Sequence, residues 1–230
     1  MNIQDFFSAM ENVSIALDNK HVITRGTDKL YPVYIILYAH NSIVGRNIRR
    51  FTHQPYSHSA VSFNSDMTNI YSFGNRMILD KDGVYHRKFG AGRESFTKKD
   101  GKWSYPETTP YAIYCIFLTK DSIDKMKKHI HTIYNNPESY RFSYDGLIKY
   151  YLNISSESTY KMFCSQFVAS LLVIGGVNLD RLPSLYSPYE LKDIQDVTLV
   201  EEGILKDFNR KKFSKRMDEI CEDRKKIPVE

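Results

Sequence analysis

The hydrophobic residues of this chain form runs typical of strands and stripes typical of helices. Nearly continuous apolar and aromatic runs at residues 31–38 and 111–118 predict two central, buried strands. Residues 57–63 and 69–73 predict two more strands, joined by the polar turn at residues 64–68. These four segments predict the core of a small sheet.

Amphipathic stripes predict helices around this sheet. One helix has Asp121 as its expected N-cap and an apolar face formed by Ile123, Met126, Ile130 and Ile133. Further helices are predicted at residues 2–12, at 43–51 with a basic face from Arg46, Arg49 and Arg50, at 144–152 after the cap Ser143, and at 208–221.

Glycines and charged residues interrupt this pattern between residues 75 and 109. We expect a long excursion over the surface there, with one weak strand near residues 84–88. Near the N-terminus, residues 13–17 and 21–23 predict a hairpin, and a last strand is expected at residues 197–200.

Cys164 lies at the beginning of a further predicted helix, whose apolar stripe ends at Gly175 and Gly176. The unpaired N–H groups and the helix dipole of a first turn favour an anion, so they push a thiol toward the thiolate. The alternative role for such a cysteine is that of a small buried hydrophobe. His58, in the strand predicted at residues 57–63, offers the imidazole that a cysteine nucleophile needs as its base.

The composition is that of one globular domain with free thiols. The 230 residues are 42% hydrophobic and 26% charged, which suffices for one well-filled core. Cys115, Cys164 and Cys221 are an odd number without paired spacing, which favours a reducing compartment over a disulfide framework. Cys115 falls in the middle of a predicted strand and is expected to be structural.

Other chemistries lack their sequence motifs. The chain has no P-loop, no GxGxxG after a strand and no GxSxG elbow. His129 and His131 are two apart on a predicted helix and so point to different sides, and we expect no metal or other cofactor. The net charge of +5 comes from scattered basic residues, so a nucleic-acid partner is not expected.

Targeting signals are also missing from the sequence. No segment approaches the ~18 unbroken apolar residues of a membrane span. Asp5 and Glu11 interrupt the N-terminal segment, which does not resemble a secretory signal. We therefore expect the chain to stay in the cytoplasm.

Four blocks of residues, taken in order, carry a family resemblance: 34–37 (YIIL), 56–63 (YSHSAVSF), 69–74 (NIYSFG) and 163–168 (FCSQFV). They resemble the circularly permuted branch of the NlpC-type papain-like hydrolases, which includes YiiX-like proteins and has the lecithin–retinol acyltransferases as distant relatives. In this branch a histidine strand precedes the cysteine helix.

The resemblance covers residues 31–205 and divides the chain. It implies an α+β fold in which a small antiparallel sheet or half-barrel packs against helices, with the catalytic cysteine at a helix N-terminus. Residues 1–30, with an amphipathic helix and the possible hairpin, would precede this papain-like domain. A basic helix in residues 206–230 would follow it.

The resemblance also implies roles for individual residues. By position, Cys164 is the nucleophile and His58 the base. The third polar group of the family, often a histidine on the strand after the histidine strand, matches Ser72, whose hydroxyl would accept the His58 N–H. A one-residue change of register would instead turn Asn75 or Tyr71 toward the site.

Three functions remain open at this point. The leading hypothesis is a cysteine peptidase or amidase that cleaves amide bonds, for instance in cell-wall-type peptides. The second is a lipid acyltransferase or thioesterase with the same Cys–His pair, held at a membrane surface by the terminal helices. The third is a non-catalytic binding module. His40, at the end of the first predicted strand, is a further candidate near the site. The sequence does not specify the substrate, peptide or acyl, or the oligomeric state.

Overall fold

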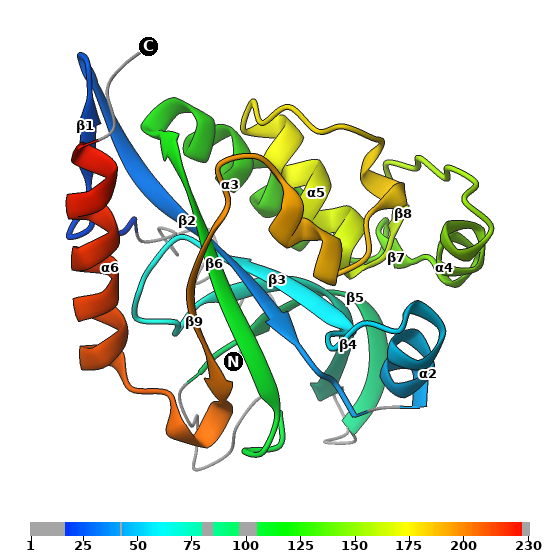
Figure 1. The fold of residues 1–230 in the computed structure, drawn as a ribbon. Coiled ribbons are helices and arrows are strands. Elements are labelled where there is room, and N and C mark those ends of the chain that lie inside the picture. Colours follow the sequence, from blue (N-terminus) through cyan, green and yellow to red (C-terminus); the bar gives the residue numbers. More distant parts are fainter. Residues whose placement is uncertain (1–16, 42, 80–84, 97–104, 227–230) are drawn as a thin grey trace.

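The computed structural model describes residues 17–41, 43–79, 85–96 and 105–226. Within these ranges the chain forms an α+β fold with five α-helices and a mainly antiparallel sheet (Figure 1). The helix predicted at residues 2–12 and most of the strand predicted at 13–17 lie outside the described residues.

The main sheet has seven strands in the order β5-β4-β3-β2-β6-β9, with β1 paired to β2 at one side, and all of its pairs are antiparallel. Its strands are β1 (Ile23–Arg25), β2 (Asp28–Tyr38), β3 (His58–Ser62), β4 (Ile70–Leu79), β5 (Tyr85–Glu94), β6 (Pro110–Thr119) and β9 (Thr198–Ile204). A separate parallel pair consists of β7 (Arg141–Phe142) and β8 (Lys161–Met162).

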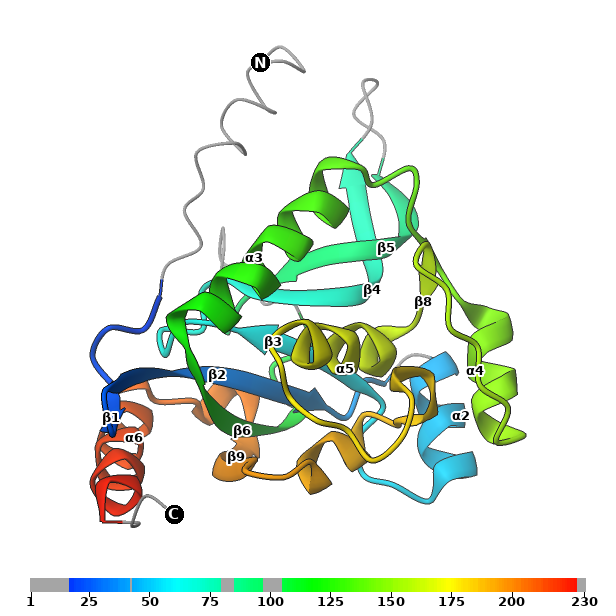
Figure 2. The same ribbon diagram turned by 90° about the horizontal axis from the view of Figure 1, so that it is seen from above.

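The helices form layers on both faces of the main sheet. They are α2 (Ile43–Thr52), α3 (Lys120–Asn135), α4 (Tyr144–Tyr151), α5 (Cys164–Ile174) and α6 (Arg210–Lys225), with the short 3-10 helices η1 (Pro183–Leu185), η2 (Tyr189–Asp193) and η3 (Leu205–Asp207). Helices α3 and α5 cover one face and α6 covers the other, while α2 and α4 lie together at one end of the sheet (Figure 2).

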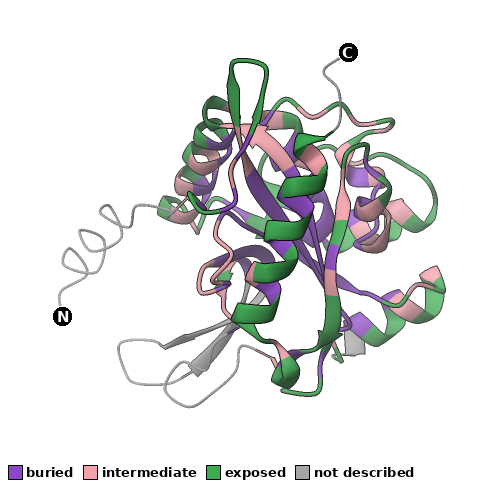
Figure 3. Ribbon diagram, turned by 60° about the vertical axis from the view of Figure 1, so that its left-hand side comes forward, coloured by how far each residue is buried: buried purple, intermediate pink, exposed green. Residues whose placement is uncertain are grey.

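Strand β2 shows how the sequence pattern builds these layers. Val33, Ile35 and Leu37 point to the core shared with α3 and α5. Tyr34 and Ile36 point to the core shared with α6. Because side chains alternate across a strand, a continuous apolar run is what a strand covered on both faces needs. Figure 3 shows the buried strands between helices whose outer faces are exposed.

Most of the predicted elements are present. The strands predicted at residues 31–38, 57–63, 69–73, 111–118 and 197–200 and the helices predicted at 43–51, 144–152 and 208–221 overlap β2, β3, β4, β6, β9, α2, α4 and α6. Ser143 caps α4 as expected, since its hydroxyl accepts from the Gly146 N–H. The four apolar residues predicted for α3 are buried, but its N-cap is Thr119 and not Asp121.

The surface excursion predicted for residues 75–109 is wrong over much of its length. Strand β4 continues to Leu79, and β5 runs from Tyr85 to Glu94 as its antiparallel partner. Gly90 and Gly92 lie in β5 opposite Gly74 and Ser72. The weak strand predicted near residues 84–88 overlaps the first part of β5 and is confirmed. Glycine is depleted in strands, so the sequence pattern concealed the continuation of this strand to Glu94, which pairing with β4 stabilises.

The first strand of the predicted N-terminal hairpin lies mostly outside the described residues. Its second strand meets β1 at Ile23, and β1 forms a hairpin with the start of β2, in which Ile23 pairs with Leu30 and Arg25 with Asp28. Its turn is tight and contains Gly26 at φ 62°, a left-handed conformation that favours glycine.

Helix α6 packs on the sheet through the apolar stripe that the sequence predicts. Phe213, Met217 and Ile220 are buried, and the Phe213 ring contacts those of Tyr34 and Phe208. This contact places the C-terminal helix against the same core as strand β2. Among the described residues, no helix is long and apolar enough to cross a membrane.

We expect Phe213→Ala to lower the free energy of unfolding by roughly 3–5 kcal/mol, because it removes a fully buried ring and leaves a cavity. Urea unfolding followed by circular dichroism measures this change. The exposed Lys212→Ala on the same helix is the matched control and should change stability by less than about 0.5 kcal/mol. Equal effects of the two changes would show that α6 does not contribute to the core.

Candidate active site

Cys164 is the first residue of α5, as the sequence predicts. Phe163 occupies the N-cap position and its side chain makes no capping hydrogen bond, so the first-turn N–H groups have no side-chain cap. The N–H groups of Ser165 and of Ser59, in β3, both bond to the Cys164 sulfur. The thiol therefore lies where the helix and the strand together supply donors to an anion.

His58 is the first residue of β3 and lies beside this sulfur. Its ring stacks on Tyr38, with centroids 5.9 Å apart and an interplanar angle of 25°. Gly74 in β4 allows the close approach, since a Cβ there would lie 3.0 Å from the His58 Cε1. A side chain at position 74 would press on the ring.

The partner of His58 on its other side is Glu94, the last residue of β5. The His58 Nε2 lies 3.1 Å from the Glu94 Oε1. The same oxygen accepts from the Tyr105 hydroxyl at 2.6 Å and from the Ser72 hydroxyl. A carboxylate that is nearly buried is stable only with such donors around it, so these residues hold Glu94 in its charged form.

The charges of this cluster determine its protonation. Burial by itself lowers the pKa of His58, but the negative charges of Glu94 and Cys164 outweigh burial and raise that pKa to about 10. Burial raises the pKa of the Cys164 thiol, but the charge and hydrogen bond of His58 together with the two backbone N–H groups bring it below its ordinary value. Burial likewise opposes ionisation of Glu94, and His58, Ser72 and Tyr105 overcome it and lower the Glu94 pKa.

These shifts favour an ion pair between a thiolate and an imidazolium. The charges of Glu94 and Cys164 both raise the pKa of His58, which favours the proton on the imidazole. Tyr105, whose pKa burial raises well above its ordinary value, stays neutral and keeps its hydrogen for Glu94. The arrangement is a cysteine–histidine–carboxylate chain.

The sequence predictions for the third residue are partly wrong. Ser72 lies in the cluster, but its hydroxyl donates to Glu94, so the carboxylate occupies the place next to His58 that we expected for the serine. Tyr71 points to the opposite core and stacks edge-on with Tyr134. The side chain of Asn75 lies outside the described residues.

His40 is close to the cluster. Its ring centroid is 6.4 Å from that of His58 and 5.1 Å from that of Tyr105. It is thus a neighbour of both rings at the site.

Glu94 and Tyr105 are the site residues that the sequence analysis missed. Both belong to the segment that was expected to cross the surface. The only local signal is an acidic residue two positions after the small-residue run Gly90-Ala91-Gly92. Pairing of β5 with β4, a long-range contact, is what brings Glu94 to His58.

A small pocket leads to Cys164 from the side of α2 and α4. Its cavity volume is about 10 Å³, which is room for about one water molecule. Its walls are almost entirely apolar and are lined by Ile48, Thr52, Leu147, Tyr150, Tyr151, Phe163, Ser165, Ser187 and Pro188 besides Cys164. Cys164 is only 3% exposed, and what exposure it has lies toward this pocket.

Arg49 fixes the position of α2, one wall of the pocket. Its guanidinium donates to the His40 carbonyl at 2.6 Å and to the Ser57 hydroxyl at 3.2 Å. It also donates to the Asn41 side chain at 2.9 Å. The basic face predicted for this helix thus includes one arginine with a structural role, next to the residue that precedes His58.

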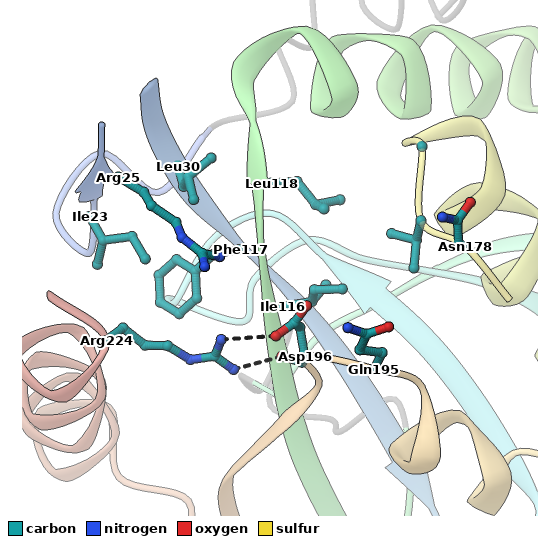
Figure 4. Close-up of a pocket in the computed structure, with 12 residues that line it drawn as sticks. Ile23, Arg25, Leu30, Ile116, Phe117, Leu118, Asn178, Gln195, Asp196 and Arg224 are labelled. Atoms are coloured by element: carbon teal, nitrogen blue, oxygen red, sulfur yellow. Dashed lines mark hydrogen bonds and ion pairs between the residues drawn. The ribbon is translucent and has the colours of Figure 1, made fainter. Parts of the chain in front are cut away.

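A second hollow lies at the opposite end of the sheet, between β1, β6 and α6 (Figure 4). Arg224 crosses it and donates to the Asp196 carbonyl at 2.7 Å and the Thr198 hydroxyl at 2.6 Å. It contains none of the cluster residues around Cys164. Through these hydrogen bonds Arg224 links α6 to the start of β9.

The two other cysteines differ from Cys164 in their surroundings. Burial raises the pKa of Cys115 to about 12 and that of Cys221 to about 11. Both are buried and free. In the part of the chain that the structure describes, no group of three or more histidine, cysteine, aspartate or glutamate side chains is arranged to hold a metal ion.

Comparison of the chain with protein-family models, with curated proteins and with solved structures found no match. The family resemblance of the four sequence blocks therefore stays a prediction.

We expect iodoacetamide to label Cys164 in preference to Cys115 and Cys221 at pH 7, because only the Cys164 pKa is lowered. Peptide mass spectrometry of the native protein after brief labelling measures this. Glu94→Gln removes the charge that keeps the proton on His58, so the proton returns to the sulfur and labelling at pH 7 slows. His58→Ala should slow it further.

Labelling of Cys164 that is as fast in both variants as in the unchanged protein would contradict the ion pair. Labelling of all three cysteines after urea unfolding serves as the control for reagent and detection.

Proposed function

We propose that the protein is a cysteine hydrolase that cleaves an amide or ester carbonyl compound through a covalent acyl-enzyme. The observation that carries this proposal is the Cys164–His58–Glu94 chain at the start of α5, in which the thiol pKa is lowered and the imidazole pKa is raised. A cysteine that served packing alone would need neither a base nor a buried carboxylate behind that base.

Each residue of the chain has a distinct role in this proposal. The Cys164 thiolate attacks the carbonyl carbon, and the proton held by His58 passes to the leaving amine or alcohol. Neutral His58 then takes a proton from water, which attacks the thioester, releases the acid and regenerates the ion pair. Glu94 stabilises the imidazolium and fixes the ring, since it binds Nε2 and leaves Nδ1 for the sulfur side.

The developing oxyanion also has donors within reach. The first-turn N–H groups of α5 have no side-chain cap and carry the positive end of the helix dipole. Backbone donors at such a position stabilise a tetrahedral intermediate without having to reorganise. The backbone N–H of Cys164 supplies this group in our proposal, since that of Ser165 bonds to the sulfur.

The arrangement of the sheet and α5 supports a more specific fold assignment, which we also propose. An antiparallel sheet presents the histidine on one strand, and the cysteine starts a helix packed against that sheet. The histidine precedes the cysteine in the chain, as in the permuted papain-like arrangement that the sequence blocks resemble. We propose this permuted papain-like fold for the domain.

We expect Cys164→Ala to reduce hydrolysis of p-nitrophenyl acetate to the uncatalysed rate, because the nucleophile is lost. His58→Ala should reduce kcat/KM by roughly 10²–10⁴-fold. Glu94→Gln should reduce it by roughly 10–100-fold, since it acts through His58. Ser72→Ala, which removes one donor to the carboxylate, should have a smaller effect than Glu94→Gln.

Cys221→Ala is the control and should retain the activity. Intact-protein mass spectrometry of a stopped reaction should show one acetyl group on Cys164. Full activity of Cys164→Ala, or acetylation at another residue, would refute the proposed function.

The pH profile of kcat/KM should be broad. Its acidic limb reports formation of the Cys164 thiolate and lies below the ordinary thiol pKa, because that pKa is lowered. Its alkaline limb lies near pH 10, where His58 loses its proton. Glu94→Gln removes a negative charge next to the ring and should move the alkaline limb to lower pH. An unchanged limb in this variant would mean that Glu94 does not act on His58.

A further inference from the structure

The hollow between β1, β6 and α6 exists because two strands part there. Strand β9 pairs with β6 only as far as Thr198 and Cys115. The next residues of β6, from Ile116 to Leu118, line the hollow instead of pairing with β9. The chain enters β9 through Asp196, whose φ of 65° lies in the left-handed region, so it approaches β6 by a turn and not as an extended strand. The end of the sheet is therefore left open.

This hollow is large enough for a small organic molecule. Its cavity volume is about 350 Å³, which falls within the roughly 300–1,000 Å³ of sites for small ligands. The pocket beside Cys164 has a cavity volume of about 10 Å³. Of these two cavities, only the hollow at the open end of the sheet has room for an organic ligand.

Much of the lining of the hollow is apolar. Ile23 of β1 and Leu30 of β2 lie on one side, and Phe117 and Leu118 belong to the exposed end of β6 (Figure 4). Val177, just after α5, adds to the opposite side. All of these side chains except Ile23 are only half-buried, so they leave apolar surface that a ligand can remove from water.

Two arginines give the hollow a positive charge. Arg25 extends into it from β1, and Arg224 crosses it from α6 (Figure 4). Arg25 is exposed and has no hydrogen-bond or ion-pair partner among the described residues. The single carboxylate of the lining, that of Asp196, lies 3.5 Å from the Arg224 Nη1 and is 57% exposed. One carboxylate against two guanidinium groups leaves one positive charge uncompensated, and that charge is the one on Arg25.

Two side-chain amides complete the lining. Asn178 and Gln195 lie across the hollow from Arg25 (Figure 4). Each amide offers both a donor and an acceptor, so the pair can bind polar groups of a ligand without adding charge. A few polar groups around an apolar cavity are typical of small-molecule sites, where they fix the orientation of the ligand.

We propose that this hollow binds a small organic monoanion, a carboxylate whose charged group pairs with Arg25 and whose apolar body covers Leu30 and Phe117. The planar guanidinium binds a carboxylate through two parallel hydrogen bonds. A ligand with several negative charges, such as a nucleotide, would bring its extra charge near the Asp196 carboxylate. A neutral ligand would leave Arg25 unpaired. The site contains none of the residues around Cys164 and goes beyond the proposed hydrolase activity.

A fluorescence titration with anilinonaphthalene sulfonate, a monoanion with an apolar body, tests this proposal. Naphthoate and naphthamide then compete with the probe, and they share one apolar body but differ in charge. We expect naphthoate to displace the probe at least about tenfold more effectively than naphthamide, because only the carboxylate forms charged hydrogen bonds with Arg25.

Variants locate the binding to the hollow. Arg25→Gln should raise the Kd of the probe roughly tenfold, because it removes the uncompensated charge. Gln195→Glu should also raise it several-fold, because it places a second carboxylate in the lining. Both residues are exposed, so neither change disturbs the core. Lys29→Gln is the matched control: it removes the same charge from the same hairpin outside the lining and should change the Kd less than about twofold.

The remaining outcomes would overturn the proposal. They are equal displacement by naphthoate and naphthamide, a Kd that Arg25→Gln changes no more than Lys29→Gln does, and absence of probe binding to the unchanged protein. Cys164→Ala should bind the probe as the unchanged protein does. Loss of binding in that variant would place the probe at the Cys164 pocket and would refute the site in the hollow. None of these results depends on whether the protein hydrolyses esters.

Discussion

A carboxylate close to the interior of a protein requires several donors, and the site around Cys164 depends on how Glu94 obtains them. Its Oε1 accepts hydrogen bonds from the hydroxyls of Tyr105 and Ser72 and faces the His58 Nε2. Without these partners burial would favour the neutral acid, and the imidazole would lose the charge that keeps it protonated. The low pKa of the Cys164 thiol thus depends on Glu94, at the end of β5, which acts through His58.

The sheet makes this possible because three adjacent strands bring their residues to one side. His58, Ser72 and Glu94 come from β3, β4 and β5, and the register pairs Ala60 with Ser72 and Ser72 with Gly92. Gly74 of β4 leaves space beside the His58 ring. Helix α5 lies on the other face and reaches the cluster only with its first residue. The thiol therefore meets the imidazole at the beginning of β3, an interior strand.

The sequence predicted those elements whose structure is determined by residues close together in the chain. The Cys164 helix and the His58 strand were predictable because apolar spacing, the glycine stop and the hairpin turn all act over a few residues. Glu94 was not predictable in this way. Its strand has glycine at two positions and charge at several others, and it is stabilised by pairing with β4. Ser72 was placed correctly near the site, but a single sequence could not show that its hydroxyl serves a carboxylate from the next strand.

Arg49 links two parts of the molecule that a substrate would contact separately. It extends from α2, a wall of the pocket, to the Ser57 hydroxyl and the His40 carbonyl, on the chain just before β3 and just after β2. Ser57 is the covalent neighbour of His58. A displacement of α2 would therefore be transmitted to the backbone that carries the His58 imidazole, so the pocket wall and the ring are mechanically coupled.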